Sequence, residues 1–365
     1  MKRQFGCLIA AAAVFSSTGA SAADQYGLER GTADVKSATT LAFGPEDILF
    51  IGDSKSAAVF AVATGDTEGD AASAKINVAD IGTSLASLLE AKKVTVNDLA
   101  VNPGTGSAFL AVTADDKAAI VKVDGGGKMT PLSLDEVRFA KVSLKDAPED
   151  KVVTTGRRSR NNRDDAITDI AYFEGKILVS GLSSSAAPSA LRELSFPFAT
   201  ADSGVSVEIY HAAHGKSEDY AAMRTFVPIM IDGEPNVVGA YVCTPLVRVP
   251  VKELEGAAEK VRGTTVAELG NRNRPLDLIS YSKEGSQFLL LSNSDRGVMK
   301  ISTDGIKENK GLTEPVSGGG TAGQKFESIA VFEGVVQMDK LNDTTALILT
   351  QSDTDVLNLK TVELP

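Results

Sequence analysis

Short apolar runs alternate with polar turns along most of the chain, in the pattern typical of consecutive β-strands. One unit, residues 274–302, reads as a strand, a polar turn, a second strand, a turn of Asn, Ser and Asp residues, and a third strand. Five further segments follow the same plan and begin at Thr39, Asn97, Thr168, Phe226 and Glu327. Candidate outer strands lie between the copies at residues 137–142, 205–210 and 264–269. The chain therefore contains six copies of one β-unit.

This repeat predicts an all-β fold, a six-bladed β-propeller with four-stranded antiparallel blades. A single sheet of this kind cannot bury both of its faces alone, so the blades must close into a ring. Because the last copy ends after its third strand, we expect residues 26–35 to supply its outer strand and close the ring. The helical spacing of Ile81, Leu85, Leu88 and Leu89 predicts one short helix between the first two blades.

The N-terminal residues 1–22 are predicted to be a secretory signal peptide. Lys2 and Arg3 precede an apolar run at residues 8–15, and small residues at positions 20–22 resemble a signal-peptidase site. This run is too short to span a bilayer, and no later stretch is long and apolar enough to do so. We therefore expect an exported protein, periplasmic or extracellular, with no membrane span. Since no linker divides residues 23–365, we expect them to form a single propeller domain.

Composition narrows the classes of partner and cofactor. The formal net charge of -11 argues against binding to nucleic acid or to anionic membranes. Cys7 belongs to the predicted signal peptide, so Cys243 is the only cysteine of the mature chain and no intramolecular disulfide is expected. The sequence has no Trp, which argues against the tryptophan-lined pocket expected of quinone-cofactor dehydrogenases. It also has no Cys-x-x-Cys-His motif, so c-type haem is not expected.

The first candidate site is a group of arginines and amides on one rim of the ring. Loops that enter the innermost strands and turns between second and third strands should open on the same rim. These segments contain Arg157, Arg158, Arg160, Arg163, Arg224, Asn271, Arg272, Asn273, Arg274 and Arg296. Guanidinium groups bind carboxylate or phosphate, so our leading hypothesis is a propeller that captures an anionic small molecule or protein segment. The alternative is that these arginines neutralise nearby aspartates.

The second candidate site is a ring of acidic residues where innermost strands are expected to begin. Its members are Asp98, Asp169, Asp277 and Glu327. Such hard oxygen ligands around a narrow channel suit Ca²⁺. Alternatively, each carboxylate accepts backbone N–H groups at the start of its strand.

Through Asn97-Asp98 and Asp277 at the innermost-strand starts, the chain distantly resembles the six-bladed family of regucalcin, gluconolactonase and strictosidine synthase. This resemblance implies a channel Ca²⁺ held by Asn, Asp and Glu side chains, and lactone or ester hydrolysis in several members. A Ca-dependent lactonase- or esterase-type hydrolase is therefore the competing hypothesis.

The third candidate site combines His211-x-x-His214 with Cys243, all expected on loops of one blade. Two imidazoles and a thiolate suit Zn²⁺ or copper, which gives a third hypothesis of redox chemistry or metal handling. As a hydrolytic pair, Cys243 and His211 would need a third, orienting group. The alternative is a pair of surface histidines and a packed cysteine.

Overall fold

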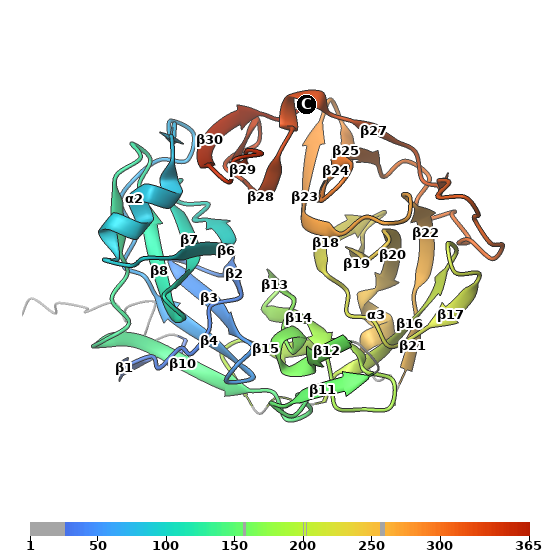
Figure 1. The fold of residues 1–365 in the computed structure, drawn as a ribbon, viewed down its shortest axis with the longest axis horizontal. Helices are drawn as coiled ribbons and strands as arrows, with labels where there is room; N and C mark the ends of the chain where they lie inside the picture. The colour runs from blue at the N-terminus through green and yellow to red at the C-terminus, as the bar shows by residue number, and fades with distance from the viewer. Residues whose placement is uncertain (1–25, 156–157, 200, 202, 256–259) are drawn as a thin grey trace, which may run out of the picture.

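Six sheets of mostly antiparallel strands surround a common axis, which confirms the six-bladed all-β propeller (Figure 1). The structure is a computed structural model that describes residues 26–155, 158–199, 201, 203–255 and 260–365. The predicted signal peptide, residues 1–22, lies outside the described residues. We number the blades by the chain order of their innermost strands and give the strands of each blade from the axis outward.

The first three blades contain four to six strands each. Blade one contains β2 (Thr40–Phe43), β3 (Ile48–Asp53), β4 (Ala58–Ala63), β10 (Val137–Ser143) and β1 (Glu29–Gly31). Blade two contains β6 (Val94–Val101), β7 (Ala108–Ala114), β8 (Lys117–Val123) and β9 (Met129–Pro131). Blade three contains β13 (Asp169–Phe173), β14 (Lys176–Leu182), β15 (Ser189–Ser195), β16 (Val205–His211), β17 (Lys216–Glu218) and β21 (Lys260–Arg262), which pairs with β16.

The last three blades contain four or five strands each. Blade four contains β18 (Thr225–Ile231), β19 (Glu234–Ala240), β20 (Pro245–Pro250), β22 (Thr264–Glu268) and β26 (Ala322–Gly323). Blade five contains β23 (Pro275–Lys283), β24 (Ser286–Asn293), β25 (Gly297–Ser302) and β27 (Phe326–Ser328). Blade six contains β28 (Val335–Lys340), β29 (Thr345–Gln351), β30 (Leu357–Glu363) and β5 (Asn77–Val78).

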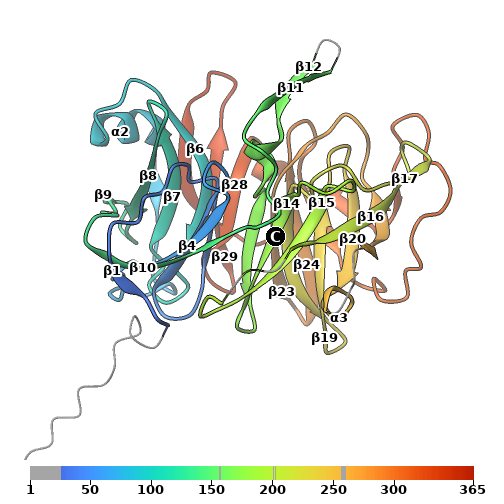
Figure 2. The ribbon, with the colours of Figure 1, turned by 90° about the horizontal axis from the view of Figure 1, so that it is seen from below.

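A few short elements lie outside the blades. The predicted helix is α2 (Ile81–Leu88), which buries Ile81 and Leu85 against blades two and six. The hairpin of β11 (Val152–Thr155) and β12 (Arg158–Asn161) projects from one rim (Figure 2). The remaining short elements are α3 (Val251–Leu254) and the 3-10 helices Asn162–Asp165 and Ala330–Phe332. Among the described residues, no helix has the length and apolar content needed to cross a membrane.

The order of the blades around the ring differs from their order along the chain. β6 of blade two contacts both β2 of blade one and β28 of blade six, whereas β13 of blade three contacts β2. Blades four and five complete the circle between blades three and six (Figure 1). The spatial order is therefore one, two, six, five, four and three. The apolar clusters follow it, because Leu110 of blade two packs with Leu347 of blade six, and Phe50 of blade one packs with Val179 of blade three.

The ring is completed by β5, and the prediction that residues 26–35 supply the outer strand of the last blade was wrong. Val78 of β5 pairs with Leu359 of β30, whereas Glu29 of β1 pairs with Phe139 of β10 in blade one. Ile76 precedes β5 and is buried in the cluster between blades two and six. This burial anchors the short strand β5 at the edge of blade six, because two residues alone provide few ladder hydrogen bonds.

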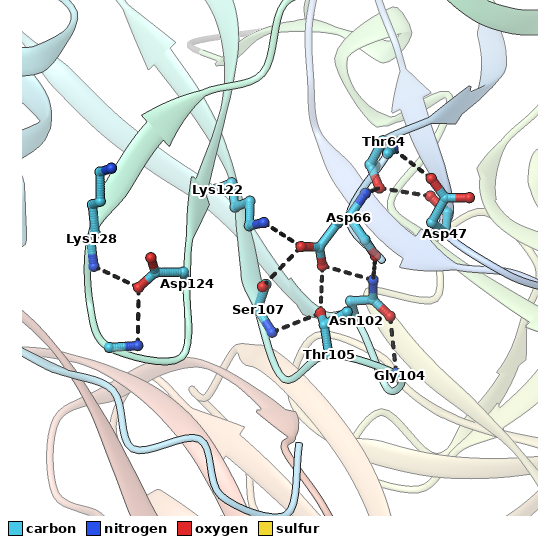
Figure 3. A network of polar contacts seen from close by, with 12 residues as sticks. Asp47, Thr64, Asp66, Asn102, Gly104, Thr105, Ser107, Lys122, Asp124 and Lys128 are labelled. Atoms are coloured by element: carbon cyan, nitrogen blue, oxygen red, sulfur yellow. Dashed lines mark hydrogen bonds and ion pairs between the residues drawn. The ribbon is translucent and has the colours of Figure 1, made fainter. Parts of the chain in front are cut away.

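The segment that leads from blade one to β5 crosses blade two and is fixed there by buried Asp66 (Figure 3). The Asp66 carboxylate accepts hydrogen bonds from Asn102 Nδ2 at 2.8 Å and Ser107 Oγ at 3.1 Å. Thr105 Oγ1 and Lys122 Nζ also donate to it. Although burial alone would raise the pKa of Asp66, the hydrogen bonds from Lys122, Thr105 and Asn102 lower it. Asp66 therefore remains ionised and holds the crossing segment on blade two.

Candidate functional site

Four aspartates on innermost strands line the channel: Asp98, Asp169, Asp277 and Asp339. They surround a cavity of about 360 Å³. Each carboxylate accepts the N–H of the next residue and an N–H from a neighbouring blade; Asp98, for example, accepts from Leu99 at 2.8 Å and from Leu41 of blade one at 2.6 Å. The other three accept cross-blade N–H groups at 2.6–2.7 Å, from Phe226, Met338 and Val101. These aspartates therefore connect the innermost strands of neighbouring blades.

Glu327 does not join this ring, and its prediction at an innermost-strand start was wrong. It lies on β27, the outermost strand of blade five, where its side chain is 65% exposed and faces Lys300 at 3.6 Å. The innermost strand of blade six is instead β28, which places Asp339 in the ring. The run Glu327 to Val331 has the same residue pattern as the strand starts of the other copies, which led to its assignment as the innermost strand. The strand that pairs with β29 is instead β28, and only residues 341–344 separate the two.

Burial raises the pKa values of the four channel aspartates. It raises the pKa of Asp98 to about 8 and the pKa of Asp169 and Asp339 to about 6. Burial and then the charge of Asp98 raise the pKa of Asp277. Two backbone donors on each carboxylate account for the positions of these residues, as the alternative interpretation of the acidic ring proposed. Binding of Ca²⁺ by Asp98, Asp169 and Asp277 stays a prediction.

The mouth of the channel is a cavity of about 800 Å³, lined by segments that enter the innermost strands. Of the predicted arginines, Arg224 and Arg274 line it. Arg224 donates to Asp165 at 2.5 Å, and Arg160 pairs with the same carboxylate. Arg163 donates to the Pro148 carbonyl at 2.6 Å. These contacts support the alternative interpretation for three arginines, which are held by acidic or carbonyl groups.

The predicted residues Asn271 to Arg274 and Arg296 lie on loops of blades four and five. Arg272, Arg274 and Arg296 are exposed, and their guanidinium groups have no acidic partner among the described residues. Asn273 is buried and its Oδ1 accepts the N–H of Asp295 at 3.2 Å. The others are Asn271, which is half-buried, Arg158, of which only the backbone in β12 is described, and Arg157, which lies outside the described residues.

The structure brings His211, His214 and Cys243 together. One donor atom from each residue lies within 4.8 Å of the others. His211 ends β16 of blade three and His214 lies in the following turn, whereas Cys243 lies in the turn between β19 and β20 of blade four. The prediction that one blade supplies all three residues was therefore wrong, because β16 lies at the boundary with blade four. The two imidazole ring centroids are 3.8 Å apart.

Glu218 of β17 holds both imidazoles. Its two carboxylate oxygens lie 2.9 Å from His211 Nδ1 and 2.7 Å from His214 Nδ1. Although burial alone would raise the pKa of Glu218, hydrogen bonds from His211, Tyr220 and His214 lower it to about 2. An ionised Glu218 accepts a hydrogen bond from each Nδ1–H, so the Nε2 atoms are the ring nitrogens left to bind another group.

Two buried polar atoms close to the histidines have no partner among the described residues: His211 Nε2 and Glu268 Oε1. Glu268 ends β22, is fully buried, and accepts the Ala213 N–H with its other oxygen at 3.1 Å. Burial raises the pKa of Glu268 to about 7. An unpaired buried polar group costs about 1–3 kcal/mol. Unpaired buried atoms beside a histidine pair and a cysteine make this region a candidate binding site.

The backbone at Cys243 is also unusual. Cys243 and Thr244 have φ values of 68° and 58°, in the left-handed region that non-glycine residues rarely adopt. Such strain concentrates at functional sites. The histidines and the cysteine could be predicted from the sequence because these residue types are rare in the chain, whereas Glu218 and Glu268 were missed. The position of Glu218, four residues after His214, was the one available signal.

The fold and the site define a six-bladed β-propeller with a histidine–cysteine cluster on its rim. No family model and no curated protein matches the chain. Among solved structures, the PQQ-bound aldose sugar dehydrogenase from Streptomyces coelicolor matches 92% of this chain and 96% of its own, with 10% identity and a TM-score of 0.31. At this level of similarity nothing about substrate or cofactor is transferred.

Proposed function

We propose that this protein is a metal-binding propeller that holds one copper or zinc ion on His211, His214 and Cys243. The observation that carries the proposal is the convergence of three donor atoms within 4.8 Å, from two neighbouring blades. Two imidazoles and a thiolate form a ligand set that copper and zinc favour. A pair of surface histidines, the alternative interpretation, does not account for the burial of His211 or for its position beside His214 and Cys243.

The surrounding residues support the same role. Metal-binding histidines commonly donate their second N–H to a carboxylate, which fixes the ring orientation and the tautomer. Glu218 accepts both Nδ1–H groups here, so it would hold the two Nε2 atoms ready for a metal. Unpaired His211 Nε2 would gain a partner on binding. A bound copper ion would supply one-electron chemistry, and zinc would supply a Lewis acid.

Metal analysis of the purified full-length protein tests this proposal. The metal-free protein is titrated with Cu(I), Cu(II) and Zn(II) against a competing chelator, and bound metal is counted by mass spectrometry. We expect one ion per chain, and at least a hundredfold weaker binding in Cys243→Ser and in His211→Ala. Val242→Ala is the matched control, because Val242 is exposed on the same turn and offers no ligand. Equal affinity in wild type and in both ligand variants would contradict the proposal.

A second candidate function is capture of an anionic small molecule or protein segment at the channel mouth. Arg274 supports it, because this exposed arginine lines the cavity and has no acidic partner among the described residues. Arg224 also lines the cavity but is already paired with Asp165. Arg274 is therefore the residue on which this function would depend.

A further inference from the structure

We infer that the proposed metal site keeps one coordination position open and that this position takes a small oxyanion, held by Arg272 and Arg296. The inference rests on the proposed function and adds the chemical class of a ligand. Its first basis is the ligand count. Over the described ranges, with their gaps, His211, His214 and Cys243 form the group of potential metal ligands, and no fourth His, Cys, Asp or Glu belongs to it. A site with three protein ligands typically completes its coordination with water or a substrate atom.

The second basis is the exposure of the site. The His211 side chain is only 5% exposed, whereas that of His214 is 43% exposed. Cys243 is half-buried. The candidate site is therefore shielded from solvent on the side of His211 and accessible to solvent on the side of His214. A small molecule can reach the fourth position without movement of a blade.

The third basis is a pair of exposed arginines, without ion-pair partners among the described residues, that belong to or lie against the loop in contact with the Cys243–Thr244 turn. The Cys243 N–H donates to the Asn273 carbonyl at 2.8 Å, which places Arg272 one residue away from this contact. Thr244 Oγ1 donates to the Gly270 carbonyl at 2.7 Å, and Arg296 lies against Gly270. A Cβ atom at Gly270 would lie 2.6 Å from Arg296 Cζ.

These two arginines lack the usual neutralising partners. Neither forms an ion pair with a described carboxylate, although the chain carries a net charge of -11. Asp295, the acidic residue next to Arg296 in sequence, accepts instead from Ser294 Oγ at 3.3 Å, and its backbone N–H donates to Asn273. Glu268, the nearest acidic residue to Arg272 in sequence, accepts the Ala213 N–H. Exposed guanidinium groups beside an electrophilic metal favour a ligand whose negative charge is spread over several oxygens. We assign a carboxylate or phosphate group to the open position.

Cobalt substitution tests this inference, because the visible spectrum of Co(II) reports the number and type of its ligands. The Co(II)-loaded full-length protein is titrated with acetate and with inorganic phosphate while the spectrum is recorded. We expect a saturable change with at least one of the two anions, and which anion binds more tightly identifies the ligand group. In Arg272→Gln and Arg296→Gln the anion should bind about tenfold more weakly, with unchanged cobalt affinity.

Arg30→Gln is the matched control, because Arg30 is an exposed arginine of blade one that pairs with Glu136. The outcomes separate the two proposals. If the protein binds none of cobalt, copper and zinc, the metal site itself is refuted; if it binds copper alone, the anion titrations are followed in the Cu(II) spectrum. If it binds cobalt but neither anion changes the spectrum, or the anions bind equally well to both arginine variants, the metal site stands and the oxyanion site is overturned.

Discussion

Asp339→Asn should remove part of the pH dependence of folding. The Asp339 carboxylate accepts the N–H groups of Lys340 and Val101, each at 2.7 Å, and so connects blade six to blade two. Burial raises its pKa from 3.8 to about 6. Below about pH 3 the carboxyl group is protonated in both the folded and the unfolded chain, because this pH lies below both pKa values. As the pH rises from 4 to 6, the unfolded chain loses this proton first, so the folded state loses stability.

The size of this effect follows from the pKa difference. A rise from 3.8 to about 6 corresponds to a loss of about 3 kcal/mol in all, at about 1.4 kcal/mol per pH unit, and most of this loss falls between pH 4 and pH 7. The amide introduced by Asp339→Asn does not ionise, but its NH₂ group meets one of the two N–H donors. That mismatch costs about 1–3 kcal/mol at every pH. The variant should therefore be less stable than wild type at pH 4 and equal to it or more stable at pH 7.

Urea unfolding followed by circular dichroism at pH 4, 5, 6 and 7 measures both effects, with EDTA present to remove divalent cations. Asp343→Asn is the matched control, because the Asp343 side chain of the same blade is 98% exposed. It should shift stability by less than about 0.5 kcal/mol at all four pH values. If the stability difference between wild type and Asp339→Asn is the same at pH 4 and pH 7, burial does not raise the pKa of Asp339.

Three further predictions concern the metal site, the channel mouth and the crossing segment. Glu218→Gln should weaken metal binding about 10–100-fold without changing the stoichiometry, as measured by chelator competition, because the amide cannot accept from both imidazoles. Arg274→Gln should abolish calorimetric binding of any anion that the channel mouth captures, whereas Arg160→Gln should not, since Arg160 is paired with Asp165; equal loss in both would contradict a specific role for Arg274. Asp66→Asn should lower the free energy of unfolding by about 3 kcal/mol in urea at pH 7, because it leaves Lys122 without its buried partner. A loss below about 0.5 kcal/mol would show that Asp66 does not hold the segment.

The fold could be predicted from the sequence because each blade repeats the same strand pattern, for instance the buried β3 and β7 after a polar turn. The spatial order of the blades could not, because every blade offers similar apolar faces to its neighbours. β5 also escaped prediction, since Asn77 and Val78 alone show no strand periodicity. The innermost strand of blade six was also misplaced, because residues 327–331 resemble the strand starts of the other copies, and Glu327 was therefore assigned to the channel.

The candidate site could be predicted from the sequence only in part, for a different reason. Histidine and cysteine are scarce, with two histidines and two cysteines in the whole sequence, so their clustering was noticeable. Acidic residues number 48, so nothing distinguished Glu218 and Glu268 from the rest. Their roles depend on which carboxylates become buried beside His211, and this is decided by the pairing of β16 with β17 and by the position of β22.

Blade six takes its outer strand from the first quarter of the chain, and this has a consequence for biosynthesis. A nascent chain that has not yet produced β28–β30 cannot cover the apolar face of blade two, although blade two itself is finished early. Prematurely terminated products should therefore expose that face to proteases and chaperones. Loss of residues before Thr40, in contrast, removes β1 and the buried side chains of Leu28, Ala33 and Ala38 from blade one, but leaves the innermost strands of all six blades in place.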